Sequence, residues 1–228
     1  MKILAIETAT DACSVALSVD GRIVDRQTRE PRVHAERVLQ MIKDCLEEAD
    51  LILASLDALA FGRGPGSFTG VRIAAGIVQG LSLGADLPVV PVSTLAGHAV
   101  AAWREFNARQ VAVAVDARMN ECYWGCFRIS EEGVASLVGE ELIAKPAAVP
   151  PPGGGDWVGV GSGWRAFPEL RSVMPAVDVR SESILPLARD IVATAIREFE
   201  RGEAVPAEQA LPVYLREKVA WRGGSSRN

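Results

Sequence analysis

The sequence is poor in cysteine and has no long apolar run. Four cysteines in 228 residues do not make a disulfide framework. Placed on one strand, Cys122 and Cys126 would lie roughly 13 Å apart at ~3.3 Å per residue, too far for a disulfide, so we expect reduced thiols. The chain has neither a run of about 18 uncharged apolar residues nor a basic segment leading into an apolar one. We therefore expect a cytoplasmic protein without a membrane span.

Histidine and basic charge are scarce as well. Neither His34 nor His98 has a cysteine, histidine or carboxylate at a ligand-like spacing, so we predict ordinary surface or helix-capping histidines and no metal or cofactor. The chain has 24 Lys and Arg against 29 Asp and Glu, a net charge of −5. This balance repels RNA phosphates, and the chain alone should bind RNA poorly.

What the sequence does contain is an alternation of short strand and helix patterns. Hydrophobic residues make up 49% of the chain, enough to build cores. Strands are predicted at 3–7, 14–18, 23–28, 56–61 and 89–92, and helices at about 33–49, at 71–83 and from 94 onward. A turn is expected at Asp20-Gly21. The alternation predicts an α/β sheet.

The second half repeats the first in a weaker form. The segment from Val111 to Asp116 is an apolar strand ending in an acid, as is the segment from Ile3 to Glu7. Further strands are expected at 121–129 and 134–142, a flexible Pro- and Gly-rich stretch at 146–155, a helix at 183–200 and a disordered tail from about 222. We predict an internal duplication, with an N-terminal domain at 1–105 and a C-terminal domain at 106–228.

A glycine-rich loop at 62–70 lies between a predicted strand and a predicted helix. Backbone N–H groups at the start of a helix can hold an anion. However, no Lys follows as in the Walker motif, and the spacing is not that of the dinucleotide fingerprint. We favour a tight turn with Ser67 or Thr69 capping the helix, and anion binding remains the alternative.

The helix after this loop carries Gly76, Gly80 and Gly84 on one stripe. A glycine inside a helix costs roughly 0.5–1 kcal/mol relative to alanine. Such a stripe lets another backbone approach, either that of the chain's own sheet or that of a helix in another subunit. With the amphipathic helix at 33–49, it makes the N-terminal half the expected interface. The predicted interface residues are Val38, Ile42, Cys45, Leu46, Arg72, Gly76 and Gly80.

No catalytic nucleophile is indicated. The sequence lacks a Gly-x-Ser-x-Gly elbow, and we predict no catalytic residues. On a strand, Cys122, Trp124 and Cys126 would share one face, with Tyr123 and Phe127 on the other. A packed strand explains these residues better than a redox site.

Three motifs resemble a known family. They are Gly-Pro-Gly-Ser-Phe-Thr-Gly-Val-Arg-Ile at 64–73, Val-Asp-Ala-Arg-Met-Asn-Glu-Cys-Tyr-Trp at 115–124 and Pro-Val-Tyr-Leu-Arg at 212–216. In this order they resemble the TsaB (YeaZ) family over nearly the whole chain. The motif residues that we single out are Gly64, Pro65, Gly66, Ser67, Phe68, Thr69, Gly70, Asp116, Arg118, Tyr214 and Arg216.

The resemblance implies both a fold and a function. The fold would be two similar actin-like/sugar-kinase/Hsp70-type (ASKHA) domains with mixed sheets and a degenerate nucleotide site in the cleft between them. The function would be that of a non-catalytic subunit that binds and activates TsaD, together with the ATPase TsaE. This complex installs threonylcarbamoyl on N6 of adenosine 37 (t6A) in tRNAs reading codons that start with A. The chain would contact tRNA only through the complex, and alone it would form a homodimer through the surface that TsaD uses.

Departures from the TsaD motifs imply an inactive paralogue. Where TsaD typically has Ile-Glu-Thr-Ser-Cys-Asp-Glu-Thr, this chain keeps Asp11 but then has Ala12 and Cys13. Where TsaD has Asn-His-x-Glu-Gly-His, Thr94 replaces the first histidine and only His98 remains. Losing one ligand of a small set weakens a metal site. Arg118 stands where active members of the superfamily usually have glycine, and we predict that it occupies space that a phosphate needs.

Two other classes of function stay open at this point. An active small-molecule or acyl kinase would need an intact Gly/Thr hairpin and an acidic metal ligand. A hydrolase or peptidase using Ser67 or His98 would need a positioned base and an orienting acid. The sequence shows neither set.

Overall fold

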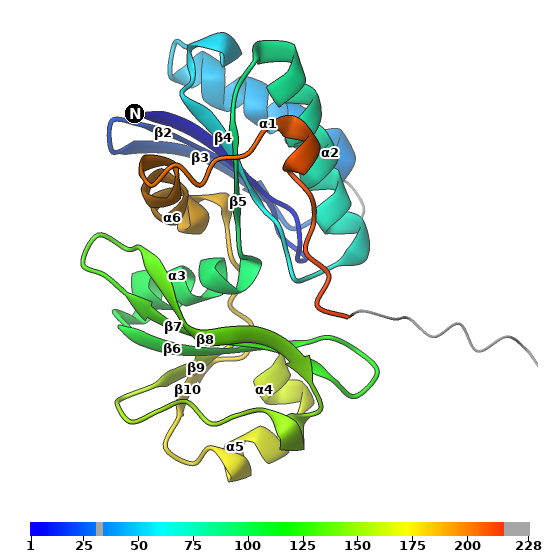
Figure 1. Ribbon diagram of the computed structural model, residues 1–228, viewed down its shortest axis with the longest axis vertical. Helices are drawn as coiled ribbons and strands as arrows, with labels where there is room; N and C mark the ends of the chain where they lie inside the picture. Colours follow the sequence, from blue (N-terminus) through cyan, green and yellow to red (C-terminus); the bar gives the residue numbers. More distant parts are fainter. Residues whose placement is uncertain (31–33, 217–228) are drawn as a thin grey trace, which may run out of the picture.

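The computed structural model describes residues 1–30 and 34–216, which form two five-stranded mixed sheets (Figure 1). The strand order is β3-β2-β1-β4-β5 in the first sheet and β8-β7-β6-β9-β10 in the second. The strands are β1 (Lys2–Glu7), β2 (Cys13–Val19), β3 (Arg22–Thr28), β4 (Ala58–Gly62), β5 (Val89–Val92), β6 (Gln110–Asp116), β7 (Cys122–Ile129), β8 (Ala135–Ala144), β9 (Val158–Val160) and β10 (Asp178–Ser181). The helices are α1 (His34–Glu48), α2 (Phe68–Ala85), α3 (Thr94–Phe106), α4 (Gly163–Ala166), α5 (Glu169–Val173) and α6 (Ala188–Glu200), with short 3₁₀ turns at Leu53–Ser55, Pro146–Ala148 and Ala207–Gln209.

The two sheets have the same topology. In the first, β1 runs antiparallel to β2 and parallel to β4. In the second, β6 runs antiparallel to β7 and parallel to β9. The outer pairs correspond as well, because β4–β5 and β9–β10 are parallel while β2–β3 and β7–β8 are antiparallel. The predicted duplication and the predicted α/β class are confirmed.

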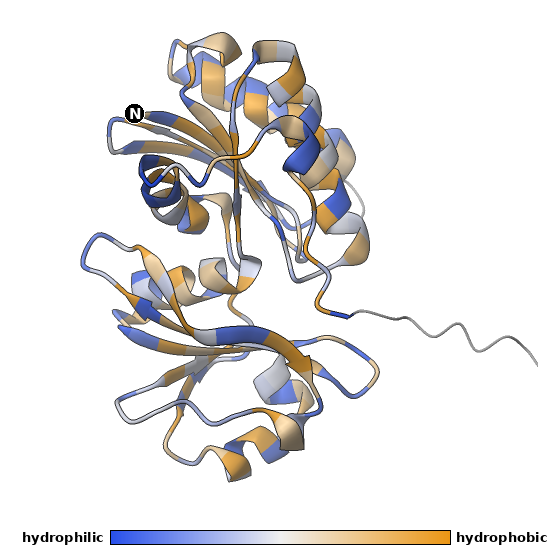
Figure 2. Cartoon of the chain, viewed as in Figure 1, coloured by the Kyte–Doolittle hydropathy of each residue, from blue (hydrophilic) through white to orange (hydrophobic). Residues whose placement is uncertain are grey.

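Helices cover both faces of the first sheet. Leu4 and Ile6 of β1 point into the core under α1 and α2, while Ile3 and Ala5 point into the core beneath α3 and α6. In the second sheet, α3 covers the inner face, and α4 lies against the outer face (Figure 1). Burial on both faces explains why the central strands β1, β4 and β6 are mostly apolar, and the strands in the middle of the first sheet stand out as hydrophobic in Figure 2.

Each sheet is covered by a helix that the other half of the sequence contributes. α3 follows the first sheet in the chain but packs on the second, whereas α6 follows the second sheet and packs on the first. After α6, the chain stays with the first sheet, where Val205 bridges Val89 and the Gln79 amide donates to the Ala210 carbonyl. The predicted boundary at 105/106 therefore separates the sheets but not the helices. We call the first sheet with α1, α2 and α6 lobe 1, and the second sheet with α3, α4 and α5 lobe 2.

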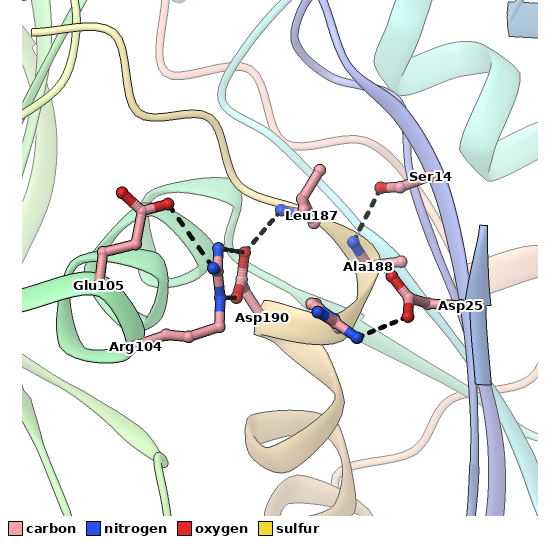
Figure 3. A network of polar contacts seen from close by, with 8 residues as sticks. Ser14, Asp25, Arg104, Glu105, Leu187, Ala188 and Asp190 are labelled. Carbon is pink, nitrogen blue, oxygen red and sulfur yellow. Dashed lines mark hydrogen bonds and ion pairs between the residues drawn. The ribbon is translucent and has the colours of Figure 1, made fainter. Parts of the chain in front are cut away.

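A polar network joins the two exchanged helices (Figure 3). Arg104 of α3 donates through Nε to the Asp190 carboxylate of α6 at 2.8 Å, and the other Asp190 oxygen accepts from the Leu187 backbone at 2.9 Å. The backbone N–H of Ala188 donates to the Ser14 hydroxyl of β2 at 2.8 Å. Burial raises the pKa of Asp190, and the Arg104 guanidinium opposes that rise. These contacts fix the start of α6 against both lobes.

Some elements differ from the sequence prediction. The helix expected from 183 begins at Ala188, and β9, β10, α4 and α5, each of three to five residues, were not predicted. Elements this short contain too few residues to show a period. The expected hairpin turn is confirmed by the positive φ of Asp20 (50°) and Gly21 (91°). The predicted helix start at 33 and the predicted disorder from 222 lie outside the described residues.

The apolar character of α2 is greater than the sequence prediction allowed. This helix is long and apolar enough to be a candidate membrane span by length and composition. One such helix is weak evidence for a membrane, because helices that cover a sheet pass the same test. Ala74, Ala75 and Val78 pack into the core of lobe 1, as such a covering helix should.

Candidate functional site

A cleft of about 730 Å³ lies between the lobes, at equivalent strand ends of the two sheets. Its lining includes residues 9–11 after β1, 65–68 before α2, 115–119 after β6, 162 and 165 around α4, 182–185 before α6, and Tyr123, His98, Tyr214 and Arg216. In open α/β sheets, ligands bind outside the carboxyl ends of the strands. The duplication therefore places two equivalent loops, the one after β1 and the one after β6, at the position where ligands bind in such sheets.

The glycine-rich loop at 62–70 is a tight turn pressed against the end of β1. Ser67 is the N-cap of α2, and its hydroxyl accepts from the Gly70 N–H at 3.4 Å. A Cβ on Gly70 would lie 1.9 Å from the Thr8 carbonyl oxygen, and one on Gly66 would lie 2.4 Å from that of Ala9. Glycine is required here for close backbone approach. The favoured interpretation is confirmed, with Ser67 rather than Thr69 as the cap.

Glu7, at the end of β1, is a buried carboxyl that the sequence analysis did not single out. One of its oxygens accepts from the Ala9 N–H at 2.6 Å, and the other accepts from the Thr94 hydroxyl at 3.0 Å. The Thr94 hydroxyl in turn accepts from the Gly64 N–H at 3.2 Å. Burial raises the pKa of Glu7 to about 7. Thr94, the residue aligned with the first histidine of the TsaD motif, thus makes a structural hydrogen bond to Glu7.

His98 lines the cleft but is buried, so the prediction of a surface or capping histidine is wrong at this position. Its Nδ1 lies 3.0 Å from the Thr94 carbonyl oxygen. A carbonyl only accepts, so Nδ1 carries the proton and Nε2 is left unprotonated in the neutral ring. Burial lowers the pKa of His98 to about 4. Within 1–30 and 34–216, no three or more His, Cys, Asp or Glu side chains are grouped to hold a metal ion.

The residues that replace the acid and threonine of the TsaD motif do not line the cleft. Ala12 and Cys13 are fully buried behind it, and only Asp11 of this stretch reaches the lining together with Ala9 and Thr10. The two departures from the motif therefore lie in the packing behind the cleft, while Thr10 and Asp11 supply a hydroxyl and a carboxylate to its lining.

The cysteines behave as packing residues. All four are buried, and Cys45, Cys122 and Cys126 are free thiols. Cys122, Trp124 and Cys126 face the outer core of lobe 2, while Phe127 faces the inner core, as the strand alternation predicted. Burial raises the pKa of Cys122 and Cys126 to about 11, so both thiols are protonated at neutral pH.

Arg118 lies at the mouth of the cleft. Its side chain is 86% exposed and pairs with the Asp116 carboxylate at 3.2 Å. Arg118 belongs to the lining of the cleft, but its side chain is mostly in solvent, so the predicted filling of phosphate space is not observed. Its φ of +62° is the left-handed conformation for which glycine is the usual residue, and Met119 and Asn120 share it with φ of +56° and +59°.

Part of the predicted interface is buried inside the chain. Val38, Ile42 and Cys45 are 0–5% exposed and pack on the first sheet, and Leu46 lies against the same core. The apolar face of α1 is therefore the face that covers the chain's own sheet, and these side chains are not available to a partner. The error arose because a covering helix and an interface helix have the same period.

The glycine stripe of α2 lies in the open. Gly76 and Gly80 are exposed, as is Gly84, and a Cβ on any of them would meet nothing within 4 Å. The alternative that these glycines serve the chain's own sheet is thus wrong. Arg72, also exposed, lies over the Phe68 ring at 3.2 Å and the Tyr214 ring at 4.9 Å.

Comparison with known proteins supports the motif-based resemblance. Residues 28–220 match the family described as "TsaD: tRNA N6-adenosine threonylcarbamoyltransferase". The chain is 46% identical over 225 residues to the "tRNA threonylcarbamoyladenosine biosynthesis protein TsaB" of Escherichia coli (strain K12), covering 97% of each. It is 39% identical over 232 residues to the protein of that name from Haemophilus influenzae, covering 97% of this chain and 96% of that protein.

A solved structure described as "YeaZ from Pseudomonas aeruginosa" has the same fold. It superposes with a TM-score of 0.87 at 48% identity, covering 94% of this chain and 99% of that one. The TsaD match reflects a related family, whereas the full-length relatives carry the TsaB name. Because this similarity spans almost the whole chain, the protein belongs to the TsaB (YeaZ) family of tRNA threonylcarbamoyladenosine biosynthesis proteins.

Proposed function

We propose that this chain is the non-catalytic subunit of the t6A-forming complex. It binds the catalytic paralogue TsaD and, with the ATPase TsaE, supports transfer of threonylcarbamoyl to N6 of adenosine 37 in tRNAs reading codons that start with A. Its relatives are named for this biosynthesis. The observation that carries the partner role is the open glycine face of α2.

The exposed glycines of α2 lower the stability of the helix, and no close contact within the chain requires them. Gly76, Gly80 and Gly84 leave open space around each Cα, so alanine would fit at every position. A helix gives up roughly 0.5–1 kcal/mol for each interior glycine relative to alanine. Close approach of another backbone offsets that cost. Phe68 (66% exposed) and Leu83 (75% exposed), at the two ends of α2, supply apolar contacts for such a partner.

The hydrogen bonds of the polar groups at and behind the cleft support a role without chemistry. The Glu7 carboxyl is occupied by Ala9 and Thr94, and the Ser67 hydroxyl accepts from Gly70 as a helix cap. The chain would then act by stabilising the competent conformation of TsaD. A difference of ~1.4 kcal/mol between two states changes their ratio tenfold.

Without TsaD, we expect a homodimer through the same α2 face in the cytoplasm. Leu39 of α1, which is 55% exposed, would join this surface in place of the buried Val38 and Ile42. Homodimer and heterodimer would then exclude each other, and their balance would regulate activity. With a net charge of −5, the chain would contact tRNA through the complex only.

The first experiment is size-exclusion chromatography with light scattering of the chain alone and mixed with TsaD from the same organism, followed by tRNA modification assays. We expect a dimer alone, a 1:1 complex with TsaD, and modification only when TsaE is also present. A chain that ignores TsaD, or that modifies tRNA by itself, would contradict the proposal.

A matched pair of variants locates the surface. Gly80→Arg places a long charged side chain on the open face, and nothing within 4 Å of its Cβ opposes folding. Val173→Arg makes the same change in exposed α5 of lobe 2, where Val173 is 42% exposed. We expect the first variant to fold but to lose both dimer and TsaD complex, and the second to keep both. If Gly80→Arg kept wild-type binding, the interface could not lie on the glycine face of α2.

A further inference from the structure

The segment Pro212–Arg216 ends the described part of the chain, and its first residues contact lobe 1. The backbone N–H of Val213 donates to the carbonyl of Arg63, a residue of the glycine-rich loop, at 2.8 Å. One residue later, the Tyr214 ring lies 6.0 Å from the Phe68 ring, at the first residue of α2. Arg72 covers both rings, and its Nη1 donates to the Phe68 carbonyl at 3.0 Å. This end of the segment is therefore attached to the first turns of α2.

Two residues after Tyr214, the same segment contacts lobe 2. Arg216 donates through Nε to a Glu121 carboxylate oxygen at 3.1 Å, and its Nη2 contacts the same oxygen. Nη2 also donates to the Ala117 carbonyl at 3.2 Å and lies 3.5 Å from the Arg118 carbonyl oxygen. One guanidinium thus holds a side chain and two backbone groups of the loop between β6 and β7. Its side chain is only 21% exposed.

The loop that Arg216 holds is backbone-strained. Arg118, Met119 and Asn120 all have positive φ, between 56° and 62°, and none of them is glycine. Asparagine adopts the left-handed conformation readily, but for Arg118 and Met119 it is unfavourable and persists only where surrounding contacts over-determine it. Inside the loop, the Arg118 N–H donates to the Asp116 carboxylate at 2.8 Å. Among the described residues, Arg216 is the group from the far side of the cleft that adds contacts to this loop.

We propose that Pro212–Arg216 is a strap across the mouth of the cleft, in which Arg216 is a positioning residue that sets the distance between the lobes. Through Tyr214 the strap also holds the first turns of α2, so that the cleft opening and the α2 surface are fixed together. The second statement rests on the proposed partner role of α2. The first concerns the chain alone.

The chemistry of arginine is needed at this position. A guanidinium presents five N–H donors in a planar fork, which lets it serve a carboxylate and backbone carbonyls at once. The ammonium of lysine keeps the charge, but it is a compact group that lacks the extended planar fork of N–H donors. Arg216→Lys should therefore retain the Glu121 ion pair and lose the carbonyl contacts, which makes it an intermediate variant between wild type and Arg216→Ala.

The distance between the lobes is measured by pulsed electron spin resonance on the full-length chain. Spin labels are attached at Arg22→Cys in lobe 1 and Val173→Cys in lobe 2, both exposed positions, while the native cysteines are buried. Dilution with unlabelled chain removes distances between copies. We expect a single narrow distribution for the wild-type background, a broad one for Arg216→Ala, and an intermediate one for Arg216→Lys. Coincident distributions for all three would overturn the strap.

A control separates the strap from the general loss of an arginine. Arg180→Ala removes an exposed ion pair with Asp178 that lies within β10. It should leave the distribution unchanged. Amide exchange gives a second measure, because the Ala117 and Arg118 N–H groups are bonded within the strained loop. Their exchange should speed up on the order of tenfold in Arg216→Ala and not in Arg180→Ala. Equal exchange in the two variants would count against the proposal.

Affinity for TsaD tests the link to α2. We expect Arg216→Ala to weaken binding by about tenfold, with partial rescue in Arg216→Lys. A broadened distribution with unchanged affinity would overturn the link and leave the strap standing. If the wild-type chain does not bind TsaD at all, the proposed function fails, while the spin-label result still decides the strap.

Discussion

Thr94 donates a hydrogen bond to Glu7 across 3.0 Å, with both side chains fully buried. Glu7 ends β1 in lobe 1, and Thr94 begins α3, the helix that covers the sheet of lobe 2. The pair therefore joins the two lobes through a buried hydrogen bond. A position that aligns with a histidine of the TsaD motif has become part of the framework, in keeping with the proposed non-catalytic role.

The first prediction concerns the pH dependence of stability. The pKa of Glu7 is raised to about 7 from an ordinary 4.5, so the folded state binds this proton more tightly and the unfolding free energy falls as pH rises between those values. The pKa of His98 is lowered to about 4 from 6.5, so its effect has the opposite sign and stability falls as pH drops through that range. Each of the two groups changes the unfolding free energy by up to ~3 kcal/mol across its pH range. The two effects oppose each other in the wild-type chain.

Single variants should reveal each effect. In urea unfolding between pH 4.5 and 6.5, the slope of the unfolding free energy against pH should be more positive in Glu7→Gln than in the wild-type chain, because the opposing Glu7 effect is removed. His98→Gln should show stability falling over the same range. Glu198, whose pKa burial also raises to about 7, adds to the fall in both variants, so the comparison is made between the two slopes. If the unfolding free energy changed with pH at the same rate in the two variants, Glu7 and His98 would not have the opposite effects assigned to them.

The second prediction compares two glycines of α2. Gly80→Ala should stabilise the isolated chain by ~0.5–1 kcal/mol, since the new Cβ meets nothing. Gly70→Ala should destabilise it by ~1–3 kcal/mol or prevent folding, since its Cβ would lie 1.9 Å from the Thr8 carbonyl oxygen. Thermal and urea unfolding provide the test. A destabilised Gly80→Ala would show that the stripe serves the chain's own fold, and the argument for a partner would lose its basis.

The third prediction addresses the contact between the exchanged helices. Arg104→Ala leaves the Asp190 carboxylate, 1% exposed, without its countercharge. Because Arg104 is itself 34% exposed, we expect a loss of ~2 kcal/mol, below the range for a fully buried pair. Arg180→Ala, which removes a pair exposed by 56% and 58%, should cost less than ~0.5 kcal/mol. Equal losses measured by urea unfolding would mean that the network in Figure 3 adds little to the join between the lobes.

The fourth prediction revises the role of Arg118. Since its side chain is 86% exposed, Arg118→Gly should not create measurable ATP binding. It should raise stability by ~0.5–1 kcal/mol, because glycine adopts the φ of +62° without the penalty of a side chain. Calorimetric titration with ATP and thermal unfolding are the measurements. New ATP binding by this variant would restore the steric interpretation.

Much of the fold could be predicted from local patterns. The strands from β1 to β8 and helices α1, α2 and α3 lie within a few residues of their expected bounds, because period and turn residues act locally. Alternation alone placed Tyr123 and Phe127 on the face of β7 opposite Cys122, Trp124 and Cys126, and the structure agrees. The elements that were missed, β9, β10, α4 and α5, are short and depend on lobe 2 packing around them.

The candidate site was less predictable. An amphipathic α1 does not reveal whether its apolar face covers its own sheet or a partner, and the structure shows the former for Val38 and Ile42. The sequence could not show whether the glycine stripe points inward or outward, since that depends on which face of α2 the sheet occupies. The contact of Arg216 with Glu121 joins positions too far apart in the chain for any periodic signal.

By itself the sequence determined the α/β class, the duplication, the turn at the glycine-rich loop and the family, because strand periods, turn residues and motifs are properties of neighbouring residues. Only the tertiary structure decided which helix covers which sheet, that Glu7 and Thr94 meet, that the Arg118 side chain is mostly in solvent and that Pro212–Arg216 crosses between the lobes. These features depend on how distant segments pack around two cores, and that packing is set by the whole chain at once.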